Sequence, residues 1–405
     1  MTEYKGIDFL RNKLNQKRGR IDVRYRFYEA KHFAQDMMIS TPPKLRGWMS
    51  SFGWCGKAVD SLADRLVLRE FGNDVFNMSD IFAMNNQDVL ADSAVLGALI
   101  CSCSFIYISA DVDGFPQMRV IDARDATGII DPITNMLIEG YAVLEADKLT
   151  GTPKTEVYLL PHETRTYIDG EHSSTYKHAA PYPLLVPVIY RPDVKRPFGH
   201  SRISRACMDY QDMAARTVKR SEISAEFYSF PQKYVLGMDP EAEQMDTWMA
   251  TLSSMLRFDK DEDGDRPTVG QFQSGSQTPH VEQLRMIAGL FAGETGLTLD
   301  DLGFPQQNPS SSEAIKASHE TLRLTARKAQ RTLGTGFLNA GYLAACIRDK
   351  QEYKRNRISK TRVLWEPIFE PDISTIGAIG DAVQKIQTSF PDYFDEDKLK
   401  ELTGI

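Results

Sequence analysis

The sequence predicts an α+β fold in which helical segments lie on both sides of a run of antiparallel strands. Short segments rich in β-branched and aromatic residues recur at close intervals between positions 103 and 169, separated by turn-forming clusters. Apolar residues at helical spacing dominate the rest of the chain. Because its 405 residues exceed the roughly 100 to 200 typical of one domain, we expect two or more substructures.

The first half of the chain is predicted to pass from helices to a sheet. Residues 2–99 are mainly helical, with apolar stripes at 59–66 and 81–99. Strands joined as antiparallel hairpins follow, and residues 168–174 are one of the turn clusters between them. The proline-rich residues 181–199 resist helix formation and run extended, so a domain-scale boundary falls at Gly199. The predicted strands are residues 103–109, 118–122, 127–131, 138–145, 155–160 and 164–169.

The second half is predicted to be mainly helical. Residues 203–221 repeat apolar or small side chains at helical spacing, and residues 281–291 do so again. Asp239-Pro240 and Thr278-Pro279 each pair a good N-cap with a first-turn proline, which indicates that a helix begins at each. The short helix after Asp239 ends in a charged turn at residues 259–267.

The longest predicted helix spans residues 311–350. Ser310 and Glu313 form a capping box at its start, and its length far exceeds the mean globular helix of about 11 to 12 residues. Gly334, Gly336 and Gly341 lie inside it, and each costs up to about 1 kcal/mol relative to Ala. We therefore expect a kink near its middle. Basic residues, a strand at 363–369 and a helical tail from Ile373 to the end complete the chain.

Composition and charge limit the function. Hydrophobic residues make up 42% and charged residues 25%, as in an ordinary globular protein. The formal charge of −7 argues against a surface that wraps tightly around nucleic acid, since such surfaces neutralise phosphates with Lys and Arg. It is compatible with a surface that DNA slides past. Five cysteines favour a reducing, intracellular setting, and we expect neither a signal peptide nor a membrane span.

Catalytic and metal-binding patterns are weak. Asp259, Asp261 and Asp263 with Gly264 resemble the start of an EF-hand loop, but Gly270 stands where a bidentate Glu is needed. We therefore expect a solvated turn rather than a calcium site. Cys101 and Cys103 would share one face of a strand, and we expect both to be buried small hydrophobes. The histidines show no HExxH spacing, and GxSxG, GxxxxGK[ST] and GxGxxG are absent. No enzyme activity and no cofactor are predicted.

Two charge patterns remain. A basic stripe lies opposite the apolar face of the long helix and is interpreted as either a solvated, salt-bridged face or a phosphate contact. Further charges lie on the helix after Gly199. Within one helix, i,i+4 pairs of such charges would contribute about 0.3 to 0.5 kcal/mol each. If copies of the helix stand side by side in a ring, the same charges would instead pair between subunits. The stripe is Lys316, Arg323, Arg327 and Arg331; the second set is Arg205, Asp209, Asp212, Arg216 and Lys219.

The order of these elements, together with four local strings, resembles the portal proteins of tailed bacteriophages. RYRFYEAKH is similar to the family's tyrosine-rich segment before a helix, and LICSCSFIYI to the strand that enters its β-rich wing. VPVIYRPD leads into a Gly-Ser-Arg-Ile junction, here Gly199, Ser201, Arg202 and Ile203. NPSSSEAIKASHETL resembles the segment between the tunnel loop and the long helix. The resemblance covers nearly the whole chain.

The resemblance implies a domain plan. It places a mixed helical and antiparallel-sheet wing at 1–200, stem helices at 201–227 and 279–296, and a clip between them at 228–278. A tunnel loop at 297–310 follows, then the long kinked wing helix at 311–350 and a wing strand with a short crown-like helical part at 351–405. The tunnel loop has no Lys or Arg, so its predicted DNA-channel lining is polar and weakly adhesive: Gln306, Gln307, Asn308 and Ser310.

The resemblance also implies partners and a place of action. Members form closed rings, dodecameric in virions, at one capsid vertex where double-stranded DNA enters and leaves without sequence specificity. They contact the major capsid or scaffolding protein, the terminase large subunit and head-completion or adaptor proteins, and assemble in the host cytoplasm. The alternatives are another ring-forming head-tail connector, which is usually a smaller protein, and a metal-dependent hydrolase that would use the Asp259–Asp263 turn.

Overall fold

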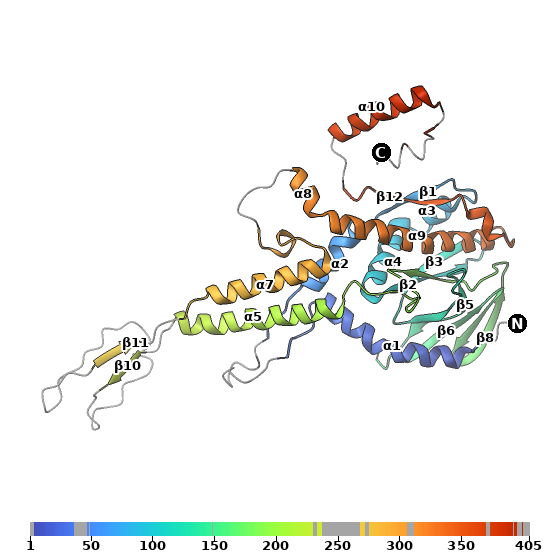
Figure 1. The fold of residues 1–405 in the computed structure, drawn as a ribbon. Coiled ribbons are helices and arrows are strands. Elements are labelled where there is room, and N and C mark those ends of the chain that lie inside the picture. The colour runs from blue at the N-terminus through green and yellow to red at the C-terminus, as the bar shows by residue number, and fades with distance from the viewer. Residues whose placement is uncertain are drawn as a thin grey trace, which may run out of the picture. The chain divides into compact units, whose positions relative to one another are not determined.

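The computed structural model describes residues 4–35, 47, 49–147, 149–229, 233–236, 268–271, 275–305, 312–369, 373–391, 393–394 and 399. It has the mixed α+β composition that the sequence predicts (Figure 1). The described helices are α1 (Ile7–Tyr28), α2 (Trp54–Ala63), α3 (Met78–Met84), α4 (Gln87–Cys101), α5 (Arg205–Ser229), α7 (Thr278–Thr295), η2 (Asp300–Leu302), α8 (Ser312–Ser318), α9 (Glu320–Arg348), η3 (Arg355–Ile358) and α10 (Ile373–Ser389). None of the described helices is both long and apolar enough to cross a bilayer.

The strands pair in antiparallel fashion throughout, as the hairpin prediction requires. Five consecutive strands form one sheet, β4-β5-β6-β7-β8, and a second sheet has the order β3-β2-β9. Two-stranded sheets pair β1 with β12 and β10 with β11. The strands are β1 (Leu68–Gly72), β2 (Cys103–Ala110), β3 (Pro116–Asp122), β4 (Ala126–Ile130), β5 (Leu137–Ala146), β6 (Pro153–Leu160), β7 (Glu163–Ile168), β8 (Glu171–Lys177), β9 (Leu185–Ile189), β10 (Lys233–Leu236), β11 (Thr268–Gln271) and β12 (Arg362–Trp365).

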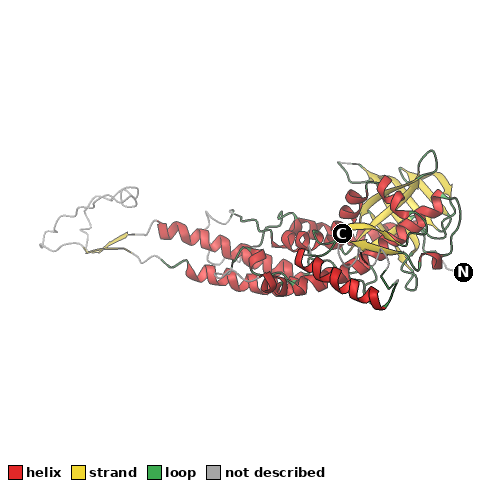
Figure 2. Ribbon diagram, turned by 90° about the horizontal axis from the view of Figure 1, so that it is seen from above, coloured by secondary structure: helices red, strands yellow, loops and turns green. Residues whose placement is uncertain are grey.

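The chain divides into two compact units. The first contains residues 1–32, 53–208 and 293–405, and it holds every sheet except β10-β11. The second contains residues 33–52 and 209–292, which include most of α5 and α7 and the β10-β11 pair. Within the second unit α5 and α7 run side by side, as Figures 1 and 2 both show, and the Ser221 hydroxyl lies 3.1 Å from Oε1 of Gln277.

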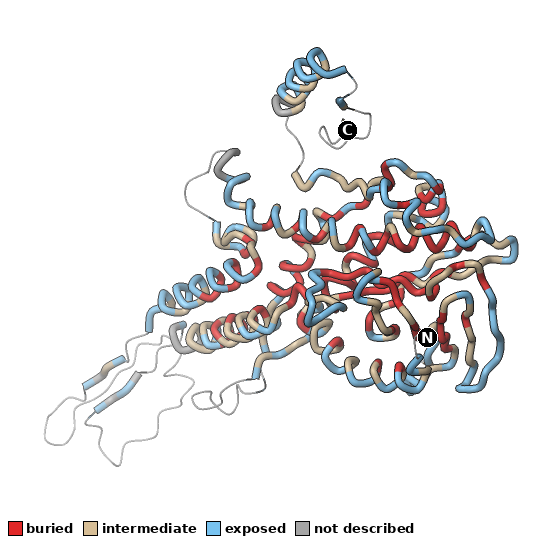
Figure 3. The backbone as a smooth tube through the Cα atoms, turned by 45° about the vertical axis from the view of Figure 1, so that its right-hand side comes forward, coloured by how far each residue is buried: buried red, intermediate tan, exposed pale blue. Residues whose placement is uncertain are grey.

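Helix α9 is the centre of the first unit's core. It packs against β2, β9, β12 and α3, and most of its residues from 333 to 347 are buried, so its second half is mainly red in Figure 3. The Phe337 ring contacts the rings of Phe82 and Trp365 at centroid distances of 6.3 and 6.0 Å. One apolar helix face therefore joins a sheet strand, an N-terminal helix and the late β12 strand.

The long helix predicted at 311–350 has no break near its middle. The helix is interrupted at His319, between α8 and α9, and continues through all three glycines. A Cβ on Gly336 would lie 3.0 Å from the Cα of Val188 in β9, and one on Gly341 would lie 2.5 Å from Sδ of Met78. The glycines are there because the helix approaches its neighbours closely, an effect that intrinsic helix propensity does not include.

Helix α1 covers one face of the five-stranded sheet. Leu10 and Leu14 of the helix form a buried cluster with Tyr141 and Val143 of β5 and with Tyr158 and Leu160 of β6. RYRFY forms the last turns of α1, and EAKH follows the end of the helix. Side-chain ammonium groups of α1 reach the sheet edge, where Lys13 and Lys17 donate to the carbonyl oxygens of Gly128 and Ala126 at 2.6 and 2.7 Å.

Some predicted elements are corrected in type or in extent. Residues 171–174, expected in a turn, belong to the exposed strand β8, and β1 interrupts the helical N-terminal region. The predicted helix 81–99 is two helices, because Asn85 ends α3 and Asn86, with φ of 53°, begins α4. The helix predicted after Asp239, the turn at 259–267 and the cap residue Ser310 lie outside the described residues.

Cys101 and Cys103 are buried, as predicted, but do not share a strand face. Cys101 ends α4 and Cys103 begins β2, with Ser102 between them at φ of 88°. All five cysteines lie among the described residues, all are buried, and none forms a disulfide. Burial raises the pKa of the Cys101 thiol, which favours an unreactive side chain.

Candidate functional site

The Gly-Ser-Arg-Ile junction forms a tight joint at the start of α5. Gly199 adopts φ of 77°, and the His200 amide donates to the carbonyl oxygen of Tyr190 at 3.0 Å. The Ser201 hydroxyl donates to the Ile100 carbonyl at 2.6 Å, and the Arg202 amide donates to the Leu99 carbonyl at 2.8 Å. These bonds attach the segment before α5 to the C-terminal end of α4.

Arg202 links this joint to two further helices. Its side chain is buried, with Nε donating to the Ala58 carbonyl of α2 at 3.3 Å and Nη2 donating to the Thr295 carbonyl at the end of α7. Ser204 adds a 2.7 Å bond to Glu294. The planar guanidinium suits this task because its donors point in fixed directions toward two separate acceptors. The joint therefore sets where α5 begins and where α7 ends.

The charged residues expected along the first long helix occupy different environments on α5. Arg205 and Asp209 are exposed, Asp212 and Arg216 are half-buried, and Lys219 is buried. The ion pairs between described residues do not include one between Arg205 and Asp209, although the two lie four residues apart on the helix. The i,i+4 pair predicted there is therefore not formed within one copy of the chain.

The segment after α7 is folded rather than open over its first part. Leu297 and Leu302 are buried, and Thr298 donates to Oδ2 of Asp301 through both its amide and its hydroxyl at 2.9 Å. Nε2 of His319 lies 3.4 Å from the same oxygen. Burial acts to raise the pKa of Asp301, but the Thr298 hydrogen bonds and His319 outweigh it and lower the pKa.

This acid therefore fastens η2 to the break between α8 and α9. Of the predicted channel-lining set, Gln306, Gln307, Asn308 and Ser310 all lie outside the described residues. The described part of the predicted tunnel loop ends at Pro305.

The basic stripe is divided between a salt bridge and exposed side chains. Arg323 makes a bidentate contact with Glu320, at 2.7 Å through Nε and 2.6 Å through Nη2, so the salt-bridged interpretation holds for it. Lys316 is exposed on α8, and Arg327 and Arg331 are exposed on α9. Arg331 also lines a surface cavity of about 570 Å³ beside β9, together with Lys328.

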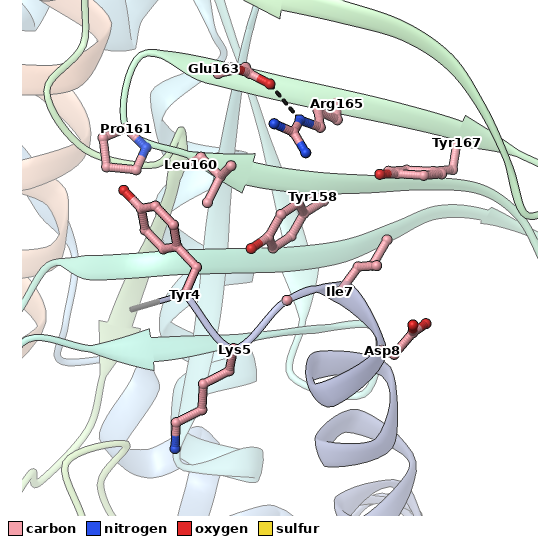
Figure 4. A pocket seen from close by; sticks show the side chains of 11 residues that line it. Tyr4, Lys5, Ile7, Asp8, Tyr158, Leu160, Pro161, Glu163, Arg165 and Tyr167 are labelled. Carbon is pink, nitrogen blue, oxygen red and sulfur yellow. Dashed lines mark hydrogen bonds and ion pairs between the residues drawn. The ribbon is translucent and has the colours of Figure 1, made fainter. Parts of the chain in front are cut away.

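A second cavity, of about 590 Å³, lies where the chain enters α1 (Figure 4). Tyr4, Lys5 and Asp8 line it from the N-terminal side, and Tyr158 and Tyr167 line it from β6 and β7. Figure 4 shows Arg165 held by Glu163 through a 2.5 Å contact. The lining offers aromatic rings and one satisfied ion pair, and it contains no Ser, Cys or His nucleophile–base pair.

Two buried acids that bond to the start of α1 were not singled out in the sequence. Glu139 of β5 accepts bonds from the amides of Lys5 and Gly6 and from the Tyr158 hydroxyl, at 3.0, 3.2 and 2.8 Å. Glu156 of β6 accepts two bonds from Arg11, at 3.2 and 2.6 Å, and one from the Tyr141 hydroxyl. The Glu156 partnership raises the pKa of Arg11. Both acids are structural clamps between the start of α1 and the sheet.

The sequence signal that could have identified Glu139 and Glu156 is the two-residue period of the strands. Glu139 stands two residues before Tyr141 in β5, and Glu156 stands two before Tyr158 in β6, so each acid shares the strand face that α1 covers. Metal chemistry has no such support, because the described residues contain no cluster of three or more His, Cys, Asp or Glu side chains able to hold an ion. Asp259, Asp261 and Asp263 lie outside the described residues.

Residues 7–376 match the family described as "Phage portal protein, SPP1 Gp6-like". The chain belongs to this family of portal proteins. It is thus a structural, non-enzymatic protein and a component of a virion.

Related portal proteins are distant in sequence. The chain is 24% identical over 385 residues to the portal protein of Mycobacterium phage L5, which covers 89% of this chain and 77% of that protein. It is 24% identical over 383 residues to the portal protein of Mycobacterium phage D29, with the same coverage. A chain from the neck of the empty gene transfer agent (GTA) particle aligns at a TM-score of 0.47 and 12% identity, covering 87% of this chain and 89% of that one.

Proposed function

We propose that copies of this portal protein close into a ring, predicted to be dodecameric, that forms the channel for double-stranded DNA at one capsid vertex. The observation that carries the proposal is the family match, which spans residues 7–376 and so includes almost every described element. A ring of this kind needs two different surface patches on each subunit, since its contacts are heterologous and close by rotation.

The described elements support the domain plan that the resemblance implies. The stem would consist of α5 and α7, which run side by side and are anchored at the Arg202 joint. The clip would contain the antiparallel β10-β11 pair, which lies between these helices in the sequence. The wing would comprise α1 to β9 with α9 and β12, and residues 297–310 would contribute the tunnel loop.

Such a channel acts through shape and weak electrostatics rather than bond chemistry. Each phosphate captured by Lys or Arg releases counterions and adds affinity, which would oppose translocation. Gln306, Gln307, Asn308 and Ser310 would instead offer neutral polar contacts that carry no base specificity. The net charge of −7 per chain acts in the same direction, since an acidic ring repels the DNA backbone.

Arg205 and Asp209 are candidates for pairing between subunits. Both are exposed on α5 and do not pair with each other, so each has a charge available to a neighbouring stem. Asp212, Arg216 and Lys219 continue the same helix toward the proposed clip. Arg327 and Arg331 of α9 are proposed to contact an acidic partner surface or DNA phosphate.

The proposed docking partners follow from the two ends of the ring. The terminase large subunit would dock during packaging, and head-completion or adaptor proteins afterwards, both at the clip. The capsid or scaffolding protein would contact the wing. Deleting residues 259–265 should leave rings intact and impair packaging or tail joining. If ring formation collapsed instead, the segment would belong to the subunit interface.

Negative-stain imaging and light scattering of the purified full chain test the proposed function directly. We expect closed rings with a central hole wide enough for duplex DNA, with or without added scaffolding protein. Monomer across all protein and salt concentrations, with scaffolding protein present, would overturn the proposal. A packaging assay in particles built with this chain then tests whether DNA passes through the ring.

A further inference from the structure

The cavity beside β9 is lined by cations from α9 and by apolar side chains from β9 and the loop after it. Its volume of about 570 Å³ lies within the roughly 300 to 1,000 Å³ typical of ligand pockets. Lys328 and Arg331 are both exposed, and neither pairs with an acid of the described chain. The described residues of the lining include no Asp or Glu. The apolar part of the lining is Pro187, Ile189 and Pro192.

Asn339 adds a buried hydrogen-bond donor to this cavity. The residue is 2% exposed, and its Oδ1 accepts a bond from Nη2 of Arg355 at 3.1 Å. Because a guanidinium has no acceptor, this bond fixes which end of the Asn339 amide faces Arg355. The amide nitrogen donates to no described residue and is not fully enclosed, so it is left for an acceptor inside the cavity. The cavity therefore offers two positive charges and one neutral donor to an anionic oxygen.

The apolar part of the lining favours a carboxylate over a DNA phosphate. The backbone of duplex DNA would meet the two cations but has little apolar surface with which to cover Ile189 and Pro192. A peptide segment that carries both carboxylates and aromatic rings satisfies the whole lining, because its rings leave water where its charges are neutralised. The cavity therefore fits an acidic, aromatic segment of protein.

The chain itself carries a segment of this chemistry just after α10. Residues 390–397 read FPDYFDED, with three aromatic rings, four carboxylates and no Lys or Arg. Phe390 is 66% exposed and Tyr393 is 58% exposed, so these two rings remain largely in water within one copy of the chain. Segment 390–397 and the β9 cavity thus match in charge, and each has apolar surface left to cover.

We propose that segment 390–397 of one copy binds in the β9 cavity of a neighbouring copy. Its carboxylates meet Lys328, Arg331 and Asn339, and its aromatic rings cover the apolar part of the lining. That the cavity belongs to a neighbour rests on the proposed ring. The segment and the cavity are different patches of the subunit, so the contact is heterologous and can repeat from copy to copy until a ring closes.

Cross-linking between two singly substituted full chains tests the contact. One chain carries Thr335→Cys, at an exposed position of the cavity lining, and the other carries Pro391→Cys and a size tag. The five native cysteines are buried, so each chain has one accessible thiol. The two chains are co-expressed and treated with a short bismaleimide. The mixed dimer on a denaturing gel should exceed that of the control pairs several-fold.

Each cysteine has a matched control on the helix that carries or precedes it. Leu324→Cys replaces the cavity position, because Leu324 is 55% exposed on α9, outside the lining and about 16 Å earlier along the helix. Ala378→Cys, exposed near the start of α10, replaces the segment position. Adding Lys328→Glu and Arg331→Glu to the Thr335→Cys chain should reduce the mixed dimer to the control level. Both cations are exposed, so the fold is preserved.

Negative-stain images of the same preparations separate the outcomes. Intact rings with no more mixed dimer than the controls would overturn this inference and leave the proposed function standing. Mixed dimer without rings would support the contact and contradict the proposed function. A cross-link that forms only within a chain carrying both Thr335→Cys and Pro391→Cys would place the segment in its own cavity and refute the contact between copies. Filter binding of duplex DNA that Lys328→Glu with Arg331→Glu abolishes, without mixed dimer, would assign the cavity to DNA phosphate instead.

Discussion

Replacing Gly199 with Ala should destabilise the joint at the start of α5 more than the backbone angle alone explains. The residue has φ of 77°, where an L side chain costs roughly 1 to 2 kcal/mol. A Cβ there would also fall on the carbonyl oxygen of Tyr190 and lie 2.8 Å from Cγ2 of Ile189. That oxygen already accepts the His200 amide at 3.0 Å, so the backbone cannot move without losing this bond.

The expected loss is worked out from these contacts. Overpacking of a tight site costs typically 1 to 3 kcal/mol, and losing one backbone hydrogen bond adds about 0.5 to 1.5 kcal/mol. Together with the φ penalty the free energy of unfolding should fall by about 3 to 6 kcal/mol. Gly170→Ala is the matched control, because Gly170 has φ of 87° and no described heavy atom would lie within 4 Å of its new Cβ.

Urea unfolding followed by circular dichroism at 222 nm measures both variants. Gly170→Ala should lose only the backbone part, roughly 1 to 2 kcal/mol, and Gly199→Ala should lose about 2 to 4 kcal/mol more. Equal shifts of the two midpoints would mean that the contact with Tyr190 carries no energy. The view of residues 199–203 as a rigid joint would then be wrong.

Three further predictions follow from other residues. Arg202→Ala leaves the Ala58 and Thr295 carbonyls without their shared donor and should lower the free energy of unfolding by about 2 to 4 kcal/mol. Arg202→Lys, whose single ammonium group cannot reach two separated acceptors, should recover only part of this loss. Full recovery by Lys in urea titrations would contradict the two-acceptor role. Burial lowers the pKa of His178 to about 4 from its ordinary 6.5. Between these values the unfolded chain binds more protons, so stability should fall as pH drops through 6.5 toward 4, by at most about 3 kcal/mol. His178→Phe should flatten this part of the pH profile of the urea midpoint, and an unchanged slope would count against it. Replacing both Gln306 and Gln307 with Lys should raise the affinity for DNA, make that affinity fall more steeply with salt, and slow packaging. Filter binding measures the affinity, and DNA protection measures packaging. Unchanged binding by intact rings would mean that these residues do not line the channel.

Local pattern was sufficient where one chain segment decides its own structure. The strands of the first sheets were predicted close to their observed bounds, because alternating β-branched and aromatic residues between turn clusters leave few other ways to bury one face. The start of α7 at Thr278 followed from its cap and first-turn proline in the same way. Strand β8 was missed because its side chains are all exposed, so no apolar alternation marks it.

The candidate site was less accessible from the sequence. The Gly-Ser-Arg-Ile string drew attention to Arg202, but its two acceptors lie 144 and 93 residues away along the chain. Glu139 and Glu156 read as ordinary strand acids, and their burial depends on α1, more than a hundred residues earlier. No local sequence pattern shows which distant residues become the hydrogen-bond partners of these side chains.

What the sequence by itself determined is the α+β class, the antiparallel hairpins, the helices and the resemblance that the family match confirms, because period, caps and turns act within a few residues of one another. Only the tertiary structure decided which side chains connect distant segments and where the long helix is interrupted. Gly336 and Gly341 would weaken an isolated helix, yet in the folded chain they let α9 pack against Val188 and Met78, and the break falls at His319 instead. The physical reason is that a residue's intrinsic preference is small, at most about 1 kcal/mol for Gly, whereas contacts between distant segments supply several.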